Sequence, residues 1–229
     1  MKNILEEWGF TIEEFTHLVR DNPSLRGVLI GYIAELKLQS MWLSSEEITA
    51  SSKPDDHDRK RKGDRVTTYR DHQFILESKS LQTSTVTQTD SGFLGKAQVD
   101  ASDRRIIELP NGHKLNTTLL LKGEFDILAV NIYAFEATWR FVFAKNEDLP
   151  TSRYRKYDPE DARYLIASLI PVTWPPRPPF RDEPFSLMNE IIREREQTKG
   201  EPPKIAIIEE PGKRPVAVDT EHPRPPKKL

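Results

Sequence analysis

Cysteine is absent from this chain of 229 residues, and several kinds of chemistry are excluded with it. A protein without cysteine forms no disulfide, builds no thiolate zinc site and has no cysteine nucleophile. The absence fits a reducing compartment, so we expect a cytoplasmic protein. The five histidines do not have the spacing of zinc ligands either; they are His17, His57, His72, His113 and His222.

Long apolar runs are also missing. No stretch approaches the length of a transmembrane helix, and the N-terminus lacks the basic start, apolar run and small-residue cleavage site of a secretory signal. We therefore expect a soluble protein without a membrane partner.

The chain has no excess of basic charge. Its 34 Lys and Arg against 36 Asp and Glu give a formal net charge of -2, which offers no general electrostatic attraction for nucleic acid. Any DNA contact has to come from local patches, and the clearest is a run of four basic residues followed by Arg65: Arg59, Lys60, Arg61 and Lys62. This run either grips phosphates or forms a solvated loop, because three nearby aspartates offset part of its charge.

The composition predicts one large domain over residues 1–197 and a flexible tail over 198–229. Residues 44–62 are almost free of apolar side chains and are expected to form a mobile loop. Of the 18 prolines, 13 lie from Pro171 onward, which predicts an extended Pro-rich arm over 171–184 and then a helix starting near Pro184.

Helix signals occur at three further places. Thr11 and Glu14 have the spacing of a capping box, and the helix that follows should stop at Asp21-Asn22-Pro23. Ser24 is expected to cap a longer helix that runs toward Trp42. Asp158, followed by Pro159, predicts a helix that extends to about Ile170.

Strand patterns predict two hairpins and a third strand pair, and the Asn111-Gly112 turn supplies one of the connections. The pairs are 65–69 with 73–80, 106–109 with 114–121, and 125–133 with 139–143. Phe74-Ile75-Leu76 should belong to a central strand that is covered on both faces. Asp126 lies in an apolar strand and should need a salt-bridge partner. The polar segment 98–105 either forms a surface turn or supplies arginines to a phosphate.

The segment that carries chemistry is Asp64, twelve intervening residues, and then Glu77-Ser78-Lys79. Residues two apart in a strand share a face, so Glu77 and Lys79 project together, and a hairpin can return Asp64 to the same end of the sheet. Two close carboxylates repel each other unless a cation lies between them, and Mg²⁺ prefers such hard oxygen ligands. The competing interpretation is an ordinary ion pair on a solvated sheet face.

This arrangement, together with a helical Glu35 in Gly31-Tyr32-Ile33-Ala34-Glu35, resembles the PD-(D/E)XK, or restriction endonuclease-like, superfamily over roughly Leu25 to Phe143. The resemblance implies an α/β fold with a mixed β-sheet flanked by helices and a Pro-rich C-terminal extension. It also implies that Asp64 and Glu77 bind Mg²⁺, or Mn²⁺ in its place, with help from the Ser78 carbonyl.

The same resemblance gives Lys79 a catalytic role and makes Glu35 an additional acid near the metal. Two features depart from the superfamily pattern. Gly63 occupies the position of the eponymous proline, and either Gln82 or Gln98 could correspond to the glutamine that some lineages carry after the lysine. The competing interpretation of Glu35 is an ordinary surface residue at the border of a helix stripe.

The function expected from these residues is a Mg²⁺-dependent DNA endonuclease of the restriction, repair or junction-cleaving kind, acting as a monomer or a homodimer. The alternative is a nucleic-acid-binding or scaffold protein that keeps the fold without cutting.

Overall fold

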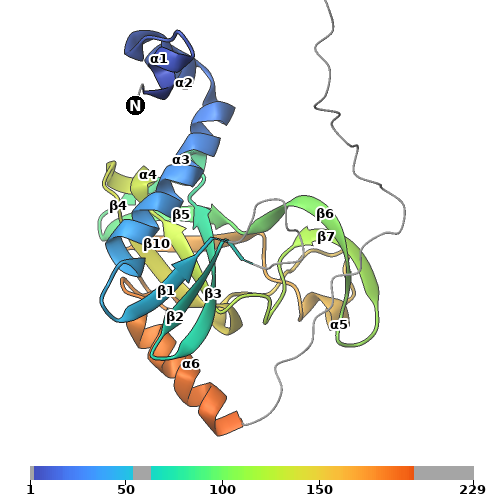
Figure 1. Ribbon diagram of the computed structural model, residues 1–229. Helices are drawn as coiled ribbons and strands as arrows, with labels where there is room; N and C mark the ends of the chain where they lie inside the picture. The colour runs from blue at the N-terminus through green and yellow to red at the C-terminus, as the bar shows by residue number, and fades with distance from the viewer. Residues whose placement is uncertain (1–2, 54–62, 199–229) are drawn as a thin grey trace, which may run out of the picture.

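The computed structural model describes residues 3–53 and 63–198 and has a mixed α/β architecture (Figure 1). Its centre is a five-stranded mixed sheet in the order β1-β2-β3-β8-β9. The strands are β1 (Ile48–Ser52), β2 (Arg65–Tyr69), β3 (His72–Ser80), β8 (Ile127–Asn131) and β9 (Phe141–Lys145). The expected class, a mixed sheet flanked by helices, is confirmed.

Strand β3 lies in the middle of this sheet, as the apolar run predicted. It pairs antiparallel with β2, and Arg70 and Asp71 adopt the left-handed backbone conformation that a two-residue hairpin turn requires. On its other side β3 runs parallel to β8, with Glu77 opposite Leu128. Phe74 is fully buried, so β3 is covered as a central strand should be.

Helices α3 (Pro23–Leu38) and α6 (Phe185–Thr198) cover one face of the sheet. Helix α3 is continued by η1 (Gln39–Leu43), a π-helical turn. Apolar side chains of these elements pack on alternate residues of the strands, and the resulting core includes Ala34, Leu38, Leu43, Phe74, Leu76, Ile127, Ala129, Phe141, Phe143, Leu187, Met188 and Ile191. This face is closed by helix-on-sheet packing.

The opposite face is covered by a second sheet, in the order β10-β5-β4. Its strands are β4 (Thr87–Thr89), β5 (Gly92–Gln98) and β10 (Leu169–Trp174), and they pack with α4 (Tyr133–Glu136) in a cluster that contains Leu128, Val130, Ala97, Val172 and Phe135. Because Glu77 and Lys79 alternate with Leu76 and Ser78, they belong to this face. Two 3-10 turns, η2 (Thr83–Thr85) and η3 (Asn146–Asp148), complete the connections.

A third part extends to the right in Figure 1 and consists of β6 (Asp100–Glu108), β7 (Lys114–Leu119) and α5 (Pro159–Ala162). It has an apolar cluster of its own, made of Ile107, Leu109, Leu119, Leu121 and Leu165. We refer to residues 100–124 together with α5 as the β6–β7 lobe.

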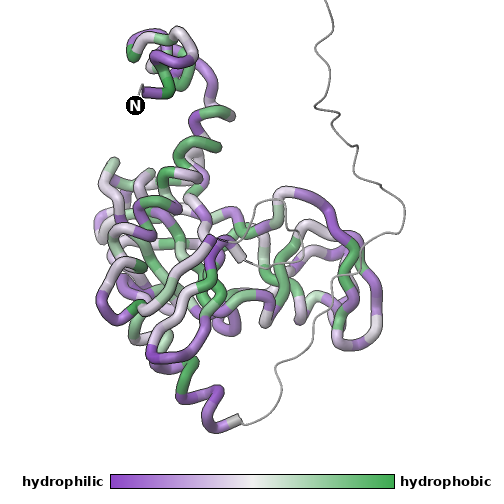
Figure 2. The backbone as a smooth tube through the Cα atoms, in the orientation of Figure 1, coloured by the Kyte–Doolittle hydropathy of each residue, from purple (hydrophilic) through white to green (hydrophobic). Residues whose placement is uncertain are grey.

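The first helices project from the body of the protein (Figure 1). They are α1 (Ile4–Glu7) and α2 (Ile12–Asp21), and neither buries a single residue. The tube in Figure 2 shows apolar positions along this projecting segment. No helix within the described ranges is long and apolar enough to cross a membrane.

Most of the element predictions hold. The capping box of Thr11 and Glu14 is formed, and the hairpins around Arg70-Asp71 and Asn111-Gly112 and the β8–β9 pair are present. The helix after Pro184 is α6. Helix α3 starts at Pro23 with Asn22 as its N-cap, two residues before the start that a Ser24 cap predicts, because the fixed φ of proline suits the first helical position.

Other element predictions are wrong. The helix expected from Asp158 to Ile170 ends at Ala162, because Leu165 and Ile166 are drawn into two separate cores, where they form bridges to Leu121 and Thr151. The Pro-rich arm begins inside β10, an edge strand of its sheet, where Pro171 is tolerated.

Two loop predictions are also wrong. Part of the loop over 44–62 is strand β1, which adds to the edge of β2. The segment 98–105, expected as a turn, is the end of β5 and the start of β6. The remainder of the loop, including the basic run 59–62, and the tail from 199 lie outside the described residues.

Candidate active site

Asp64 lies at the point where β2 begins alongside the middle of β3. Its backbone N–H donates to the carbonyl of Leu76 at 2.9 Å, and its carboxylate oxygen Oδ2 accepts the N–H of Ser78 at 2.7 Å. The Asp64 carboxylate therefore accepts the Ser78 N–H in place of a backbone carbonyl, just before β2 begins. This contact fixes Asp64 against the Glu77-Ser78-Lys79 segment.

Gly63, directly before Asp64, has a backbone conformation that excludes proline. Its φ is +72°, and a Cβ at this position would lie 2.4 Å from Cγ2 of Ile75 and 2.9 Å from the carbonyl oxygen of Leu76. Proline holds φ near −65° and cannot adopt this conformation. The approach of the chain to Asp64 thus requires glycine.

Glu77 and Lys79 project from the same face of β3, and the Lys79 ammonium lies 2.7 Å from Oε1 of Glu77. Glu77 is only 8% exposed. Burial raises the pKa of Glu77 to about 7; Lys79 opposes this shift, whereas the charge of Asp64 adds to it. The carboxylate of Glu77 is therefore only partly compensated by its lysine.

Lys79 is influenced by several acids. Its burial alone would lower the pKa of Lys79, but Glu77, Asp64 and Asp100 together raise that pKa above its usual value. The structure thus brings Asp64, Glu77 and Lys79 together at one end of the central strand. Among the described residues, no group of three or more His, Cys, Asp or Glu is arranged to hold a metal ion.

The carbonyl of Ser78 faces the same side as Asp64. The N–H and C=O of one strand residue point in the same direction, and the N–H of Ser78 donates to Asp64. Because β2 begins at Arg65, opposite Leu76, residues of β3 after Leu76 have no partner in β2.

Glu35 is not joined to this group. Its carboxylate pairs with Lys53 at 2.8 Å, and in the described part of the chain no hydrogen bond or ion pair links it to Asp64 or Glu77. Arg65, expected as a phosphate contact, is buried instead, and its guanidinium donates to Oε1 of Gln39 at 2.7 Å. Arg65 therefore lies inside the fold and not on a DNA-facing surface.

Gln82 and Gln98 lie side by side, with Nε2 of Gln82 donating to Oε1 of Gln98 at 2.6 Å. Gln98 in turn lies 3.5 Å from Asp100, whose pKa is raised by burial against the opposing effects of Gln98 and Lys79. The bridge between Leu81 and Ala97 joins the chain after β3 to β5. Strand β6 starts shortly after β5, and its first residue, Asp100, interacts electrostatically with Lys79.

Two acids near the site were not singled out from the sequence. Asp100 interacts electrostatically with Lys79, and Glu124 contributes to the raised pKa of Glu77. The signal for Asp100 is its position directly after the alternating buried residues Ala97 and Val99. Glu124 is buried in a turn and gives no comparable pattern. The salt bridge expected for Asp126 is present, with Arg195 as its partner.

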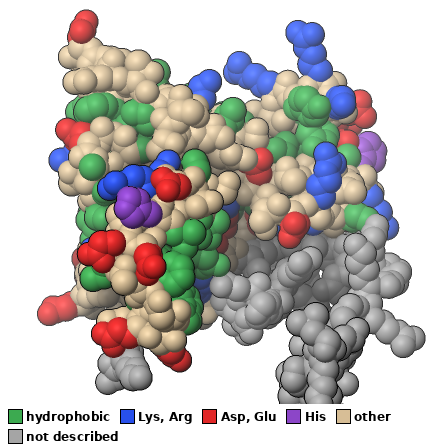
Figure 3. All heavy atoms as spheres, turned by 90° about the horizontal axis from the view of Figure 1, so that it is seen from above, with side chains coloured by type: hydrophobic (Ala, Val, Ile, Leu, Met, Phe, Trp, Pro, Cys, Tyr) green, Lys and Arg blue, Asp and Glu red, His purple; other side chains and the backbone are tan. Residues whose placement is uncertain are grey.

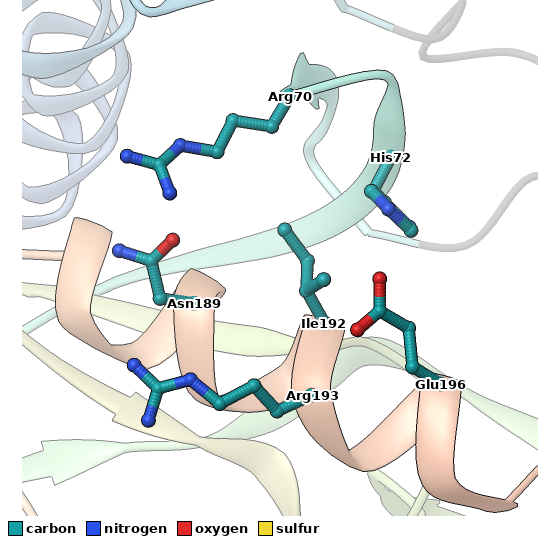
Figure 4. Close-up of a pocket in the computed structure, with 6 residues that line it drawn as sticks. All are labelled: Arg70, His72, Asn189, Ile192, Arg193 and Glu196. Carbon is teal, nitrogen blue, oxygen red and sulfur yellow. The ribbon is translucent and has the colours of Figure 1, made fainter.

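An open cavity of about 390 Å³ lies elsewhere (Figure 4). Arg70 and His72 line it from the β2–β3 turn, and Asn189, Ile192, Arg193 and Glu196 line it from α6. This turn is at the opposite end of β2 from Asp64, so the cavity is not part of the candidate site.

Comparisons with known proteins give little further information. No protein-family model matches the chain, and no curated protein matches it. Among solved structures, a bacterial homing endonuclease, I-Ssp6803I, is similar at 15% sequence identity and a TM-score of 0.33, over 78% of this chain and 98% of that chain. Function therefore has to be inferred from the geometry of the site.

Proposed function

We propose that this protein is a metal-dependent nuclease that hydrolyses phosphodiester bonds in DNA. The observation that carries the proposal is the buried Glu77, held beside Asp64 and Lys79 at the end of the central strand. A buried carboxylate with a second acid nearby is costly to maintain, and such groups are concentrated at functional sites.

The residues fit a hard divalent cation. Asp64 and Glu77 offer two carboxylates, and the Ser78 carbonyl faces the same side as Asp64. Mg²⁺ is commonly held by one or two carboxylates and keeps several waters, so a third acid is not needed. Burial raises the pKa of Glu77 although Lys79 opposes the shift, so the ionised carboxylate is only partly compensated, and a bound cation would add to that compensation. Mn²⁺ should substitute for Mg²⁺ at these oxygen ligands.

In this proposal each residue has a separate task. Asp64 and Glu77 bind the metal with the Ser78 carbonyl, and Lys79 orients the attacking water or stabilises negative charge on the phosphate. When bound, the metal supplies a more acidic water and neutralises charge on the phosphate. Glu35, held by Lys53, would act only from outside this group. Gln82 and Gln98 would position Asp100 beside Lys79.

Cleavage assays with designed variants test the proposal. Purified protein is incubated with Mg²⁺ and plasmid, single-stranded, branched and RNA substrates, and binding of Mn²⁺ is followed through the melting temperature. Asp64→Ala and Glu77→Ala should each lower the cleavage rate at least about a thousandfold and remove the metal-induced stabilisation. Full cleavage by Glu77→Ala would be fatal to the proposal.

Asp161→Asn is the matched control for these variants. Asp161 is a buried acid of the β6–β7 lobe with partners of its own. This substitution should therefore leave both cleavage and the response to Mn²⁺ intact. A loss of cleavage in all three variants would indicate a general effect on the fold.

The second candidate is a nucleic-acid-binding or scaffold protein that does not cut. The 2.7 Å ion pair between Lys79 and Glu77 favours it, because each group already has a partner without a metal. A scaffold should show no change in melting temperature with Mg²⁺ or Mn²⁺, whereas a metal site should raise it.

A further inference from the structure

The N-terminal helices expose an unusual amount of apolar surface. We refer to α1, α2 and the first half of α3, residues 4–33, as the N-terminal arm. Of thirteen large apolar residues that are exposed in the described part of the chain, eight lie in this arm, and Leu36 and Met41 follow it. Figure 3 looks down on this end of the molecule and shows hydrophobic side chains at the surface between acidic ones.

The arm gains little from the rest of its own chain. Helices α1 and α2 bury no residue, and the first buried residue of α3 is Ala34. Short helices are marginal in water unless an apolar face is packed against something. Together, the exposed apolar residues from Ile4 to Met41 leave on the order of 1,000 Å² of their surface accessible to water, spread over α1, α2, α3 and η1.

The exposed face of α3 has the form of a helix-packing surface. Val28, Tyr32 and Leu36 are 57%, 51% and 66% exposed and recur every four residues, so they form one stripe. Gly27 and Gly31 lie beside this stripe, and a Cβ at either position would meet nothing within 4 Å. Glycine within a helix costs stability relative to alanine, and nothing in the described part of this chain requires it there.

The charges of the arm favour a second copy of this chain over nucleic acid. Between positions 3 and 34 the chain has five acidic residues and two arginines, and this balance repels a phosphate backbone. Helix α2 carries Glu13 and Glu14 in its first turn and Arg20 in its last. Within the described ranges, neither the Glu13 carboxylate nor the Arg20 guanidinium has an ion-pair partner.

A two-fold contact pairs identical surfaces in opposite directions. Two antiparallel α2 helices would therefore bring the acidic end of each next to Arg20 of the other. We propose that the N-terminal arm is a dimerisation surface, on which the α2–α3 face packs against the same face of a second copy. The apolar area available on the arm is similar to the roughly 800 Å² per partner that stable interfaces bury.

The oligomeric state of the full chain tests this proposal. Sedimentation equilibrium should show a dimer, and Val28→Glu combined with Tyr32→Glu should weaken dimerisation by at least about a hundredfold, because both charges would be buried in the interface. Leu94→Glu is the matched control: Leu94 is 41% exposed but lies on β5, so this variant should remain dimeric. A wild-type chain that is monomeric at about 100 μM, or a dimer that survives the double substitution, would overturn the proposal.

Gly27→Ala and Gly31→Ala give an independent measurement on variants that fold at least as well. Alanine favours the helix, so the helical signal of the monomer should not fall, while the dimer should weaken about tenfold if the two α3 helices approach closely at the glycines. An unchanged dissociation constant would contradict close packing at α3. A monomer that cosediments with phospholipid vesicles would assign the arm to a lipid surface and reject the dimer.

Discussion

Two parts of this molecule bury the same kinds of charged group in different ways. In the β6–β7 lobe, the Asp161 carboxylate accepts a hydrogen bond from Asn111 at 2.7 Å and lies 2.9 Å from Nδ1 of His113. The hydrogen bond from Asn111 is the main reason that the pKa of Asp161 is lowered, with His113 contributing against the effect of burial. At the candidate site the opposite holds, and the pKa of Glu77 is raised to about 7.

Two half-buried lysines, Lys122 and Lys79, differ in the same way. Lys122 in the lobe donates to the backbone carbonyls of Asn146, Glu147 and Leu149, and burial lowers its pKa although nearby acids oppose this. Lys79 at the site is surrounded by carboxylates, which raise its pKa despite burial. In the lobe, each of these charged groups therefore has hydrogen-bond partners within the protein: Asn111 for Asp161, and backbone carbonyls for Lys122. The site holds charges that compensate one another incompletely, which is the arrangement expected where a ligand completes the set.

The largest effect on stability should come from the lobe. Glu124 is 4% exposed; it receives two hydrogen bonds from Arg105 and one from the N–H of Leu121. Glu124→Ala leaves Arg105 buried without its counter-charge, so the free energy of unfolding should fall by about 3–5 kcal/mol. Urea unfolding of the metal-free protein measures the change.

Glu77→Ala is the comparison for this variant, because it removes another buried glutamate. It should cost less than about 1 kcal/mol or even stabilise the metal-free protein, since it relieves repulsion with Asp64, and Lys79 keeps the nearby charges of Asp64 and Asp100. Equal losses in the two variants would erase the distinction between site and lobe.

A smaller effect is expected for the two lysines, and it rests on the proposed nuclease activity. Lys79→Ala removes a cation that competes with the metal, so metal-induced stabilisation should persist or increase, while turnover falls on the order of a hundredfold, or about 2.7 kcal/mol. Paired Mn²⁺ titrations and cleavage rates measure both quantities. Loss of metal binding in Lys79→Ala would show that this residue has a different role.

Lys122→Ala provides the contrast. The Lys122 ammonium donates to the backbone carbonyls of Asn146 and Glu147. Its removal should therefore lower the free energy of unfolding and leave the stabilisation by Mn²⁺ unchanged. A change in the Mn²⁺ midpoint in this variant would indicate that the lobe is coupled to the site.

The central part of the fold could be predicted because its signals are local. The hairpin around Arg70-Asp71, the capping box of Thr11 and Glu14 and the burial of Phe74 all follow from residues close together in the sequence. The second sheet was missed because β4 is a short, exposed strand and β10 lies far along the chain from β4 and β5. Leu165 and Ile166 show the same limit, since tertiary bridges override the helix pattern around them.

The candidate site was predictable to a similar extent. Spacing and strand alternation placed Glu77 and Lys79 on one face, and the hairpin returned Asp64 to them. The positions of Asp100 and Glu124 depend on how the lobe folds back toward β3, which no local pattern encodes. Arg65 shows the opposite failure. Its place beside a basic run predicted a phosphate contact, but Arg65 is buried and donates to Gln39.

The smallest predicted effect concerns Asp161 and the dependence of its contribution on pH. The folded pKa of Asp161 lies below its unfolded value, so its stabilising contribution is present above about pH 4 and is lost as the pH falls through the folded pKa. At pH 7, Asp161→Asn should lower the free energy of unfolding by about 1–2 kcal/mol, because the amide replaces a charged acceptor of the hydrogen bond from Asn111. Urea unfolding of both proteins from pH 7 to pH 3 measures the difference, which should shrink in the most acidic part of that range. A difference that grows as the pH falls would mean that the carboxyl of Asp161 is not stabilised in its ionised form, and the contrast between the lobe and the site would then fail at its best-partnered residue.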